Sequence, residues 1–276
     1  MTHMIYVVPS LKAKEKLQCE GNAWAESQGF AYVPRGKRTI QDLMDEYGED
    51  FLVYSSRGPQ IDRPEGSHFF SLNMAELRIQ NLRKGQRDHL LEALMGVKEY
   101  DLRLAATQPP ISVLDCTCGF GSDAAVASFG LPAGSRVDAL EVSPLLEAVT
   151  AWGFSHFVHK KDDVTAALRR ISLRCGDYRD YLLSDEGPVY DVLYFDPMFQ
   201  RPVEASCQFQ PVRAIMEHGG LTRDLIERAL QKARRRVVIK ERDFRQLCRD
   251  FPDVALYGGK YSRIGYAVLE CDSWKK

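Results

Sequence analysis

The sequence predicts an α/β protein whose larger part is a mainly parallel sheet with helices on both faces. From residue 111 onward, short apolar runs alternate with helical segments, which is the pattern of a doubly wound sheet. A glycine-containing turn joins the first apolar run to a helix, as expected at the first strand-to-helix junction of a nucleotide-binding sheet. The last two of the seven predicted strands are too close in sequence for a crossover helix, so we expect them to form an antiparallel hairpin.

The first 66 residues are predicted to form a separate small α/β subdomain. Strands are expected at 5–8, 30–34 and 51–55, and helices at 11–28 and 40–47. Breaker residues separate these elements, among them the Gly58-Pro59 pair after the third strand. The predicted domains are residues 1–66 and 67–276. The second begins with a lead-in, 67–110, that holds a strand at 68–71 and a basic helical stretch at 74–95 interrupted at Gly85.

The larger domain repeats a strand followed by a helix. Strands are predicted at 111–115, 136–141, 171–175, 189–195, 236–240, 254–257 and 265–270. Helices are predicted at 122–129, 144–157, 161–170, 178–183, 221–233 and 243–249. In such a sheet the ligand lies just past the carboxyl ends of the strands, so the residues at those ends are the candidates for binding and catalysis.

The composition is that of an ordinary enzyme with a sizeable core. The 276 residues are 45% hydrophobic and 27% charged, and the formal net charge is −1. Any contact with nucleic acid must then depend on local basic patches rather than on the field of the whole protein. No apolar run approaches the roughly 18 residues of a membrane helix, and the first residues do not resemble a signal peptide. We therefore expect a cytoplasmic protein with no membrane partner.

The cysteines predict reduced thiols. They number seven, and Cys116 and Cys118 are closer together than a CxxC pair. No group of His, Cys and Asp in the sequence has the spacing of metal ligands, so we expect a reaction that needs no metal.

The strongest motif is the turn Asp115-Cys-Thr-Cys-Gly-Phe-Gly-Ser-Asp-Ala124. It contains no lysine, so it does not suit phosphates as a P-loop would, and Gly119-Phe-Gly121 is not followed by the third glycine of a dinucleotide fingerprint. A glycine turn flanked by acids suits a ligand with a cationic amino-acid end and a sulfonium, namely S-adenosylmethionine. We expect this cofactor to contact Asp115, Thr117, Gly119, Gly121, Ser122 and Asp123.

Acids also follow the second and third strands of the predicted sheet. Glu141 can accept hydrogen bonds from both ribose hydroxyls of an adenosine, and the alternative is a surface acid near a helix start. Asp177 can accept a hydrogen bond from the adenine amine, and the alternative is an N-cap for the next helix, a role compatible with the first. Acids after successive strands predict an adenosine site more specifically than any one of them alone.

The motif Tyr194-Phe-Asp-Pro-Met-Phe199 ends the fourth strand and carries the predicted chemistry. The lone pair of an exocyclic amine on a base is delocalised. A carboxylate and a backbone carbonyl that accept hydrogen bonds from its two N–H groups can aim that lone pair at a sulfonium methyl group. Asp196 would supply the carboxylate, Pro197 the carbonyl, and Phe199 a ring that stacks on the base. The alternative is a buried strand that ends in an Asp-Pro turn with core aromatics.

With these motifs, the chain resembles class I S-adenosylmethionine-dependent methyltransferases, and among them the J-type small-subunit ribosomal RNA guanine-N2 methyltransferases. The resemblance runs from about residue 68 to residue 270 and includes Arg236-Val-Val-Ile-Lys240 and the hairpin that begins at Lys260-Tyr261. It implies a Rossmann-like class I methyltransferase sheet and methyl transfer to a guanine in ribosomal RNA. It also implies cofactor contacts at Ser122, Asp123, Glu141, Val142, Gly176, Asp177 and Asp196.

The chain departs from that family where RNA would bind. The family's loop after Asp-Pro-Met-Phe is rich in lysine, whereas this one reads Gln200-Arg-Pro-Val-Glu-Ala-Ser-Cys207. We therefore expect fewer phosphate contacts. The candidates for phosphate contacts elsewhere in the chain are Arg78, Arg83, Lys84, Arg87, Lys240 and Arg242. The alternative for the first four is a solvated helix face, and the alternative for Lys240 and Arg242 is that they simply close the fifth strand. Two alternatives stay open: a methyltransferase of a small molecule or protein, and a cofactor-binding module without catalysis.

Overall fold

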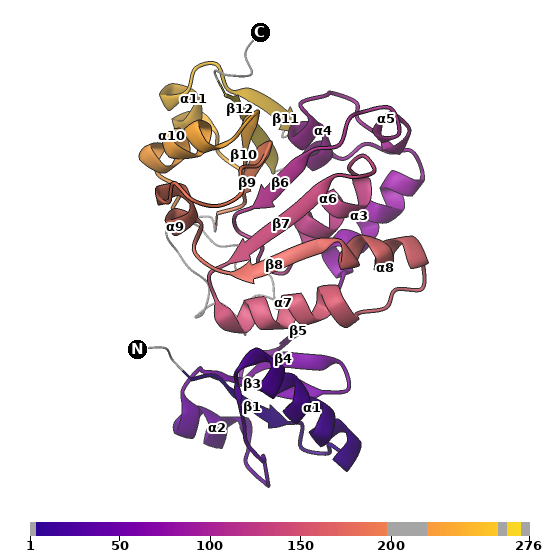
Figure 1. Ribbon diagram of the computed structural model, residues 1–276, viewed down its shortest axis with the longest axis vertical. Helices are drawn as coiled ribbons and strands as arrows, with labels where there is room; N and C mark the ends of the chain where they lie inside the picture. Colours follow the sequence, from indigo (N-terminus) through magenta and orange to yellow (C-terminus); the bar gives the residue numbers. More distant parts are fainter. Residues whose placement is uncertain (1–3, 198–219, 259–263, 272–276) are drawn as a thin grey trace. The chain divides into compact units, whose positions relative to one another are not determined.

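The computed structural model describes residues 4–197, 220–258 and 264–271 of the chain. The chain divides into two compact units. The first comprises the described residues up to Ser71 together with Ser143–Phe157, and the second comprises Leu72–Val142 and most of the chain after Phe157. Each unit contains a sheet of its own (Figure 1).

The first unit is built on a five-stranded sheet of order β2-β1-β3-β4-β5. β1 pairs in parallel with β2 and β3, and the other pairs are antiparallel. Val7 packs with Ala25 of α1 and its neighbour Val8 packs with Leu43 of α2, because successive strand residues point to opposite faces. The elements are β1 (Tyr6–Pro9), α1 (Glu15–Gln28), β2 (Ala31–Tyr32), α2 (Ile40–Tyr47), β3 (Phe51–Ser55), β4 (Gly58–Arg63), β5 (Gly66–Phe69) and α7 (Pro144–His156).

The strand β4 is absent from the sequence prediction, because Gly58-Pro59 has the composition of a break. In the structure this pair begins the strand, and the two residues between Ser55 and Gly58 form a tight hairpin connection from β3. Gly58 has a φ of +87°, and a Cβ there would lie 2.5 Å from the ring of Trp152, so the position requires glycine. The strand predicted at 68–71 overlaps β5 of this sheet, which begins at Gly66, so the domain boundary that we predict at residue 66 falls at the start of this strand.

The second unit is built on a seven-stranded sheet of order β11-β12-β10-β9-β6-β7-β8. Only β12 runs antiparallel to its neighbours β10 and β11, so the expected closing hairpin is confirmed. Its elements are α3 (Asn73–Arg83), α4 (His89–Met95), α5 (Leu102–Ala105), β6 (Ser112–Asp115), α6 (Ser122–Gly130), β7 (Arg136–Glu141), α8 (Asp162–Arg169), β8 (Ile171–Cys175), α9 (Tyr178–Leu183), β9 (Val192–Phe195), α10 (Arg223–Lys232), β10 (Arg236–Glu241), α11 (Arg245–Asp250), β11 (Ala255–Gly258) and β12 (Gly265–Glu270).

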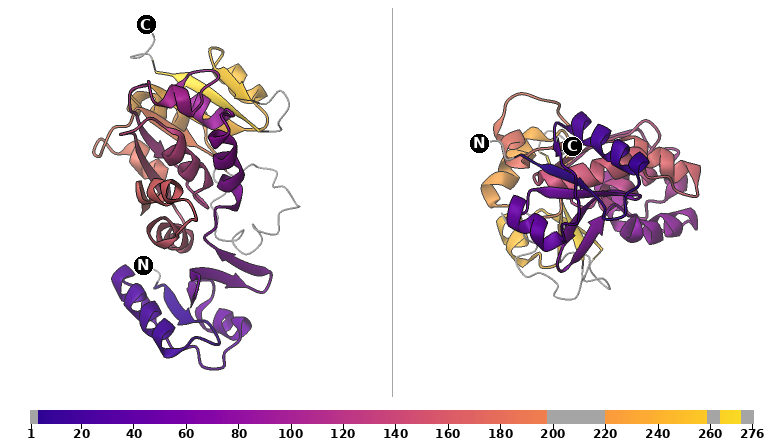
Figure 2. Two further views of the ribbon diagram at one scale, coloured as in Figure 1. Left: turned by 90° about the vertical axis from the view of Figure 1, so that its right-hand side faces the viewer. Right: turned by 90° about the horizontal axis from the view of Figure 1, so that it is seen from below.

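Helices cover both faces of this sheet (Figures 1 and 2). α9 and α10 lie over one face, where Tyr178 and Ile226 join the core formed by Phe195 and its neighbours on the strands. α3, α4 and α6 form the other layer, with α4 against β10, β11 and β12 and α3 against α6. Successive side chains of β9 point to opposite faces of the sheet and so contact different helical layers. Phe195 meets Tyr178 edge-on, whereas Tyr194 reaches Asp123 of α6.

The basic stretch predicted at 74–95 folds as two helices, α3 and α4, with a break between them. Gly85 has a φ of +76°, which ends the first helix. Asp88 begins the second, because its side chain accepts a hydrogen bond from the N–H of Leu90 at 3.0 Å. The break places Arg78 of α3 beside Asp88, and this pair enters the site described below.

Candidate active site

The candidate site lies at the carboxyl edge of the seven-stranded sheet. The parallel register pairs Asp115 at the end of β6 with Tyr194 of β9, and Glu141 at the end of β7 with Cys175 of β8. The ends of these strands therefore meet at one edge, which brings together the acids that the sequence separates.

The turn after β6 is tied to the strands on both sides of it. The N–H of Cys116 donates to the carbonyl of Tyr194 at 2.8 Å, and the N–H of Cys118 donates to that of Leu140 at 2.9 Å. Gly119 and Gly121 have φ values of +54° and +73°, in the region that glycine favours. Gly121 is also the N-cap of α6, so the turn leads directly into the start of that helix.

Glu141 holds the same turn from β7. Its carboxylate accepts a hydrogen bond from the N–H of Gly119 at 2.8 Å, and the residue is only 7% exposed. The alternative of a surface acid is therefore wrong. The carbonyl of Glu141 accepts the N–H of Gly176 at 2.9 Å, which ties the turn after β8 to this strand end as well. Val142, the next residue, accepts from the thiol of Cys175 at 3.9 Å.

Asp177 is the N-cap of α9, as one of the two interpretations of the sequence expects. Its carboxylate accepts from the backbone N–H of Arg179 at 2.8 Å and from the Nε of that guanidinium at 2.8 and 2.9 Å. The side-chain hydrogen bonds from Arg179 lower the pKa of Asp177, so the group carries its negative charge at neutral pH. Capping does not exclude a contact with an adenine amine, and that role stays a prediction.

Asp196 directly follows β9 and has well-defined partners. Its N–H donates to the hydroxyl of Thr117 at 2.7 Å, which links the motif predicted to be catalytic to the glycine turn. Its Oδ2 accepts from the Nζ of Lys240 at 2.7 Å, and the side chain is 28% exposed. Burial raises the pKa of Asp196 to about 6, against the opposing effect of Lys240. Pro197 follows, and Phe199 lies outside the described residues.

A buried charge network stands behind Asp196. Lys240 at the carboxyl end of β10 also donates to Asp123 at 2.8 Å, and the hydroxyl of Tyr194 donates to the same carboxylate at 2.6 Å. Arg78 binds Asp123 from α3. Burial alone would raise the pKa of Asp123, but Lys240 and Arg78 bring it below its ordinary value. Asp115 differs: burial raises its pKa well above the ordinary value.

Two predicted phosphate ligands therefore need correction. Arg78 and Lys240 were candidates for RNA phosphates, but in the structure both bind carboxylates inside the site. Their positive charge is needed there, because burying several carboxylates costs free energy unless cations pair with them. One signal in the sequence does indicate this role for Lys240: it lies at the carboxyl end of the fifth predicted strand, at the same edge as the acids.

The family comparison decides the enzyme class. Residues 77–264 match the family described as "Putative SAM-dependent methyltransferase", where SAM is S-adenosylmethionine. The chain belongs to this family. Protein YpiP from Bacillus subtilis (strain 168) is 31% identical over 211 residues, which are 76% of this chain and 78% of that protein. Ribosomal RNA small subunit methyltransferase J from Dechloromonas aromatica (strain RCB) is 28% identical over 204 residues, which are 72% of this chain and 76% of that protein.

A solved structure of another protein has a similar fold. The SAM-dependent methyltransferase from Neisseria gonorrhoeae is 18% identical and has a TM-score of 0.63, over 98% of this chain and 97% of that one. The expectations of a class I methyltransferase sheet, of a methyltransferase and of SAM as its cofactor are confirmed.

The residues at the carboxyl edge fit SAM. Among the described residues, the neighbour that a Cβ built on Gly119 would have within 4 Å is the carbonyl oxygen of Thr117 at 3.9 Å, so the described part of the chain leaves room for a ligand beside the turn. Asp115 and Asp123 lie in that turn and Glu141 binds it, and carboxylates are groups that can accept hydrogen bonds from an ammonium or from hydroxyls such as those of the cofactor. In the described part of the chain, no group of three or more His, Cys, Asp or Glu could hold a metal ion, and no helix is long and apolar enough to span a membrane.

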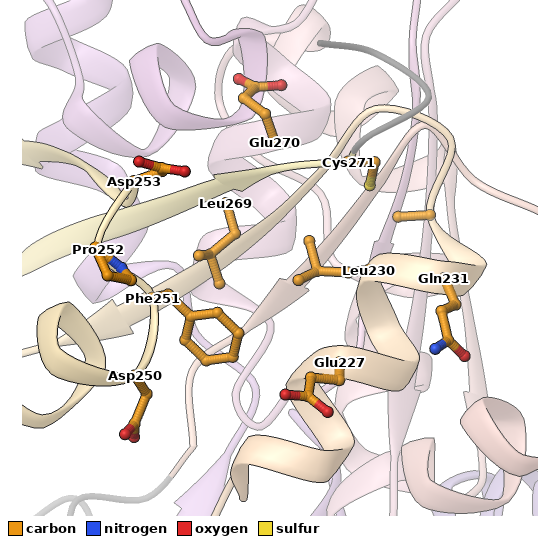
Figure 3. A pocket seen from close by; sticks show the side chains of 11 residues that line it. Glu227, Leu230, Gln231, Asp250, Phe251, Pro252, Asp253, Leu269, Glu270 and Cys271 are labelled. Atoms are coloured by element: carbon orange, nitrogen blue, oxygen red, sulfur yellow. The ribbon is translucent and has the colours of Figure 1, made fainter.

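A cavity of the methyltransferase unit lies away from this site (Figure 3). It is lined by residues of α10, by Asp250–Asp253 and by the end of β12. Glu270 of this lining pairs with Arg236, the first residue of β10, so the cavity is at the amino edge of the sheet, opposite the acids. It therefore does not belong to the candidate active site.

Proposed function

We propose that this methyltransferase transfers a methyl group to the exocyclic amine of a base, and specifically to N2 of a guanine in small-subunit ribosomal RNA. The observation that supports it most directly is Asp196 at the end of β9. One of its carboxylate oxygens is held by Lys240, and no hydrogen bond to the other is present among the described residues. The second oxygen is thus free to accept an N–H of a substrate.

The cofactor-binding residues are proposed from their places at the sheet edge. The turn from Asp115 to Asp123 would face the methionine end of SAM, through the residues predicted from the sequence. Glu141 would accept the ribose hydroxyls with the carboxylate that also holds the N–H of Gly119. Asp177, with Val142 and Gly176 at the neighbouring strand ends, would bind the adenine. The carboxylate of Asp123 is already committed to Lys240 and Arg78, so its part is to complete the turn.

The proposed chemistry uses few protein groups. SAM supplies an electrophilic methyl group on a sulfonium, whose electron pair stays on sulfur when the S–CH3 bond breaks. Asp196 and the carbonyl of Pro197 accept hydrogen bonds from the two N–H groups of the amine and so direct its lone pair at the methyl carbon. As the N–CH3 bond forms, nitrogen gives up a proton, which Asp196 can accept because its pKa is raised by burial to about 6. Phe199 would stack on the base.

An RNA substrate is supported by the relatives and by exposed basic residues. The relative from Dechloromonas aromatica carries the name of a ribosomal RNA small subunit methyltransferase. After Arg78 and Lys240 are assigned to carboxylates, the phosphate candidates are Arg83, Lys84, Arg87 and Arg242, all of which are exposed. Arg83 pairs with Asp163 at the surface, and such pairs contribute only about 0–1 kcal/mol, so a phosphate can replace the partner.

The decisive test is methyl transfer to RNA. Purified protein and SAM with a labelled methyl group are incubated with small-subunit particles from a strain that lacks this gene, and the nucleosides are analysed by mass spectrometry. We expect label in N2-methylguanosine, a loss of labelling as salt rises, and strongly reduced labelling by the Asp196→Asn variant. Label on a small molecule or a protein, with none in any RNA fraction, would overturn the proposal and favour the other substrate classes.

A further inference from the structure

Lys240 joins the catalytic motif to the rest of the site. It extends from the carboxyl end of β10, and its Nζ lies 2.7 Å from Oδ2 of Asp196 and 2.8 Å from Oδ2 of Asp123. Its side chain is only 14% exposed. An ammonium group in such a place is stable only with charged partners, and the two carboxylates serve as those partners. Lys240 is thus a bridge between an acid of α6 and the acid after β9.

The far end of this bridge is anchored firmly. Asp123 receives hydrogen bonds from the hydroxyl of Tyr194 and from Arg78, besides the one from Lys240. Arg78 is held in turn by both oxygens of Asp88, at 2.7 and 2.8 Å. Groups from α3, α6, β9 and the N-cap of α4 therefore fix the position of the Lys240 ammonium, and that ammonium fixes one oxygen of Asp196.

We propose that Lys240 is a positioning residue for methyl transfer, which holds the Asp196 carboxylate in its charged form and in the orientation that presents Oδ1 to the substrate amine. This inference rests on the proposed function of Asp196. Lys240 itself touches neither the base nor the methyl group. Its effect is exerted entirely through the carboxylate that it binds.

The charges around Asp196 determine the sign of the effect. Burial raises the pKa of Asp196, and the carboxylates of Asp123 and Glu241 raise it further, whereas Lys240 lowers it. The other titratable and charged groups around the network are Asp115 of β6, Arg78 of α3, Asp88 before α4, Tyr194 of β9 and Tyr266 of β12. Of the two cations in the network, Arg78 and Lys240, it is Lys240 that directly contacts Asp196 in the described structure.

Removal of Lys240 should therefore move the titration of Asp196 upward. An adjacent cation lowers the pKa of a carboxyl group by about 1–3 units, so Lys240→Met should raise the pKa from about 6 by that amount. The ionised fraction at pH 7, and with it kcat/KM, should fall by between about twofold and about a hundredfold. Lys240→Arg keeps the charge and should stay near the wild-type profile. Asp123→Asn removes a neighbouring negative charge and should shift the titration the other way, to lower pH.

The experiment follows the titration of Asp196 by two independent readouts. The first is the 13C carboxyl shift of labelled aspartate, with Asp196→Asn to assign the signal, and it needs no turnover. The second is kcat/KM against pH on the RNA substrate. We expect both midpoints to rise in Lys240→Met and to fall in Asp123→Asn. A merely structural role would lower activity equally at every pH.

The outcomes separate the two proposals. If the wild-type protein methylates no RNA but the carboxyl titration shifts as expected, the substrate proposal fails and the action of Lys240 on Asp196 stands. If the midpoint of Asp196 is the same in the wild type and in Lys240→Met, the inference is overturned. Should Lys240→Met fail to fold, Lys240→Gln, which removes the charge but keeps a polar group, takes its place, and an unchanged midpoint of Asp196 in that variant contradicts the proposal.

Discussion

Replacement of Glu141 by alanine tests the cofactor site most directly. The carboxylate is buried and accepts the N–H of Gly119 at 2.8 Å, and we propose that it also accepts the ribose hydroxyls of SAM. A hydrogen bond to a charged group contributes about 1.5–3 kcal/mol. The alanine variant should therefore lose about that much free energy of unfolding through the loss of this hydrogen bond, and a further, separate amount in cofactor binding.

The loss of affinity can be stated as a ratio. A lost contribution of about 1–3 kcal/mol corresponds to a Kd for SAM that is about 5- to 150-fold higher. Isothermal titration calorimetry on folded variants measures it, for SAM and for its demethylated product alike. Glu141→Gln keeps an acceptor for Gly119 and should show a smaller change in stability, and Glu186→Ala, an exposed acid of the same unit, should match the wild type. A folded Glu141→Ala protein with wild-type affinity would refute the ribose assignment.

Further expectations concern chemistry, pH, the network and RNA. Asp196→Asn should lower kcat by about 10²–10⁴-fold while the Kd for SAM changes little; full activity in this variant would exclude its part in catalysis. Wild-type activity should fall as pH drops through about 6, because the pKa of Asp196 is raised and its ionised form is the active one; a flat rate from pH 5 to 8 contradicts this. Tyr194→Phe should lose about 1.5–3 kcal/mol of unfolding free energy in urea titrations, through its bond to Asp123. Arg83→Glu with Lys84→Glu should weaken RNA binding in filter assays, with the affinity for SAM as the unchanged control.

The sequence by itself determined the order of elements in the larger unit and the edge where the site lies. Strands β6, β7 and β8 were predictable, because apolar runs, glycines and helix caps are local signals in the sequence. The acids Asp115, Glu141 and Asp196 could be placed together for a topological reason: the carboxyl ends of parallel strands share one edge. Strand β4 could not be predicted, because the pair Gly58-Pro59 is locally a signal for a break. It begins a strand here because a tight hairpin pairs it with β3, and the ring of Trp152 packs against Gly58.

Only the tertiary structure decided which charges meet. A basic residue in a sequence carries no direction, so Arg78 and Lys240 were equally compatible with RNA phosphates, a solvated face or an internal partner. Folding places residue 78 of α3 and residue 240 of β10 on the same carboxylate of α6, 45 and 117 positions away along the chain. The physical reason is the cost of burying the acids of the site without counter-charges, which only the assembled sheet and helices bring within reach.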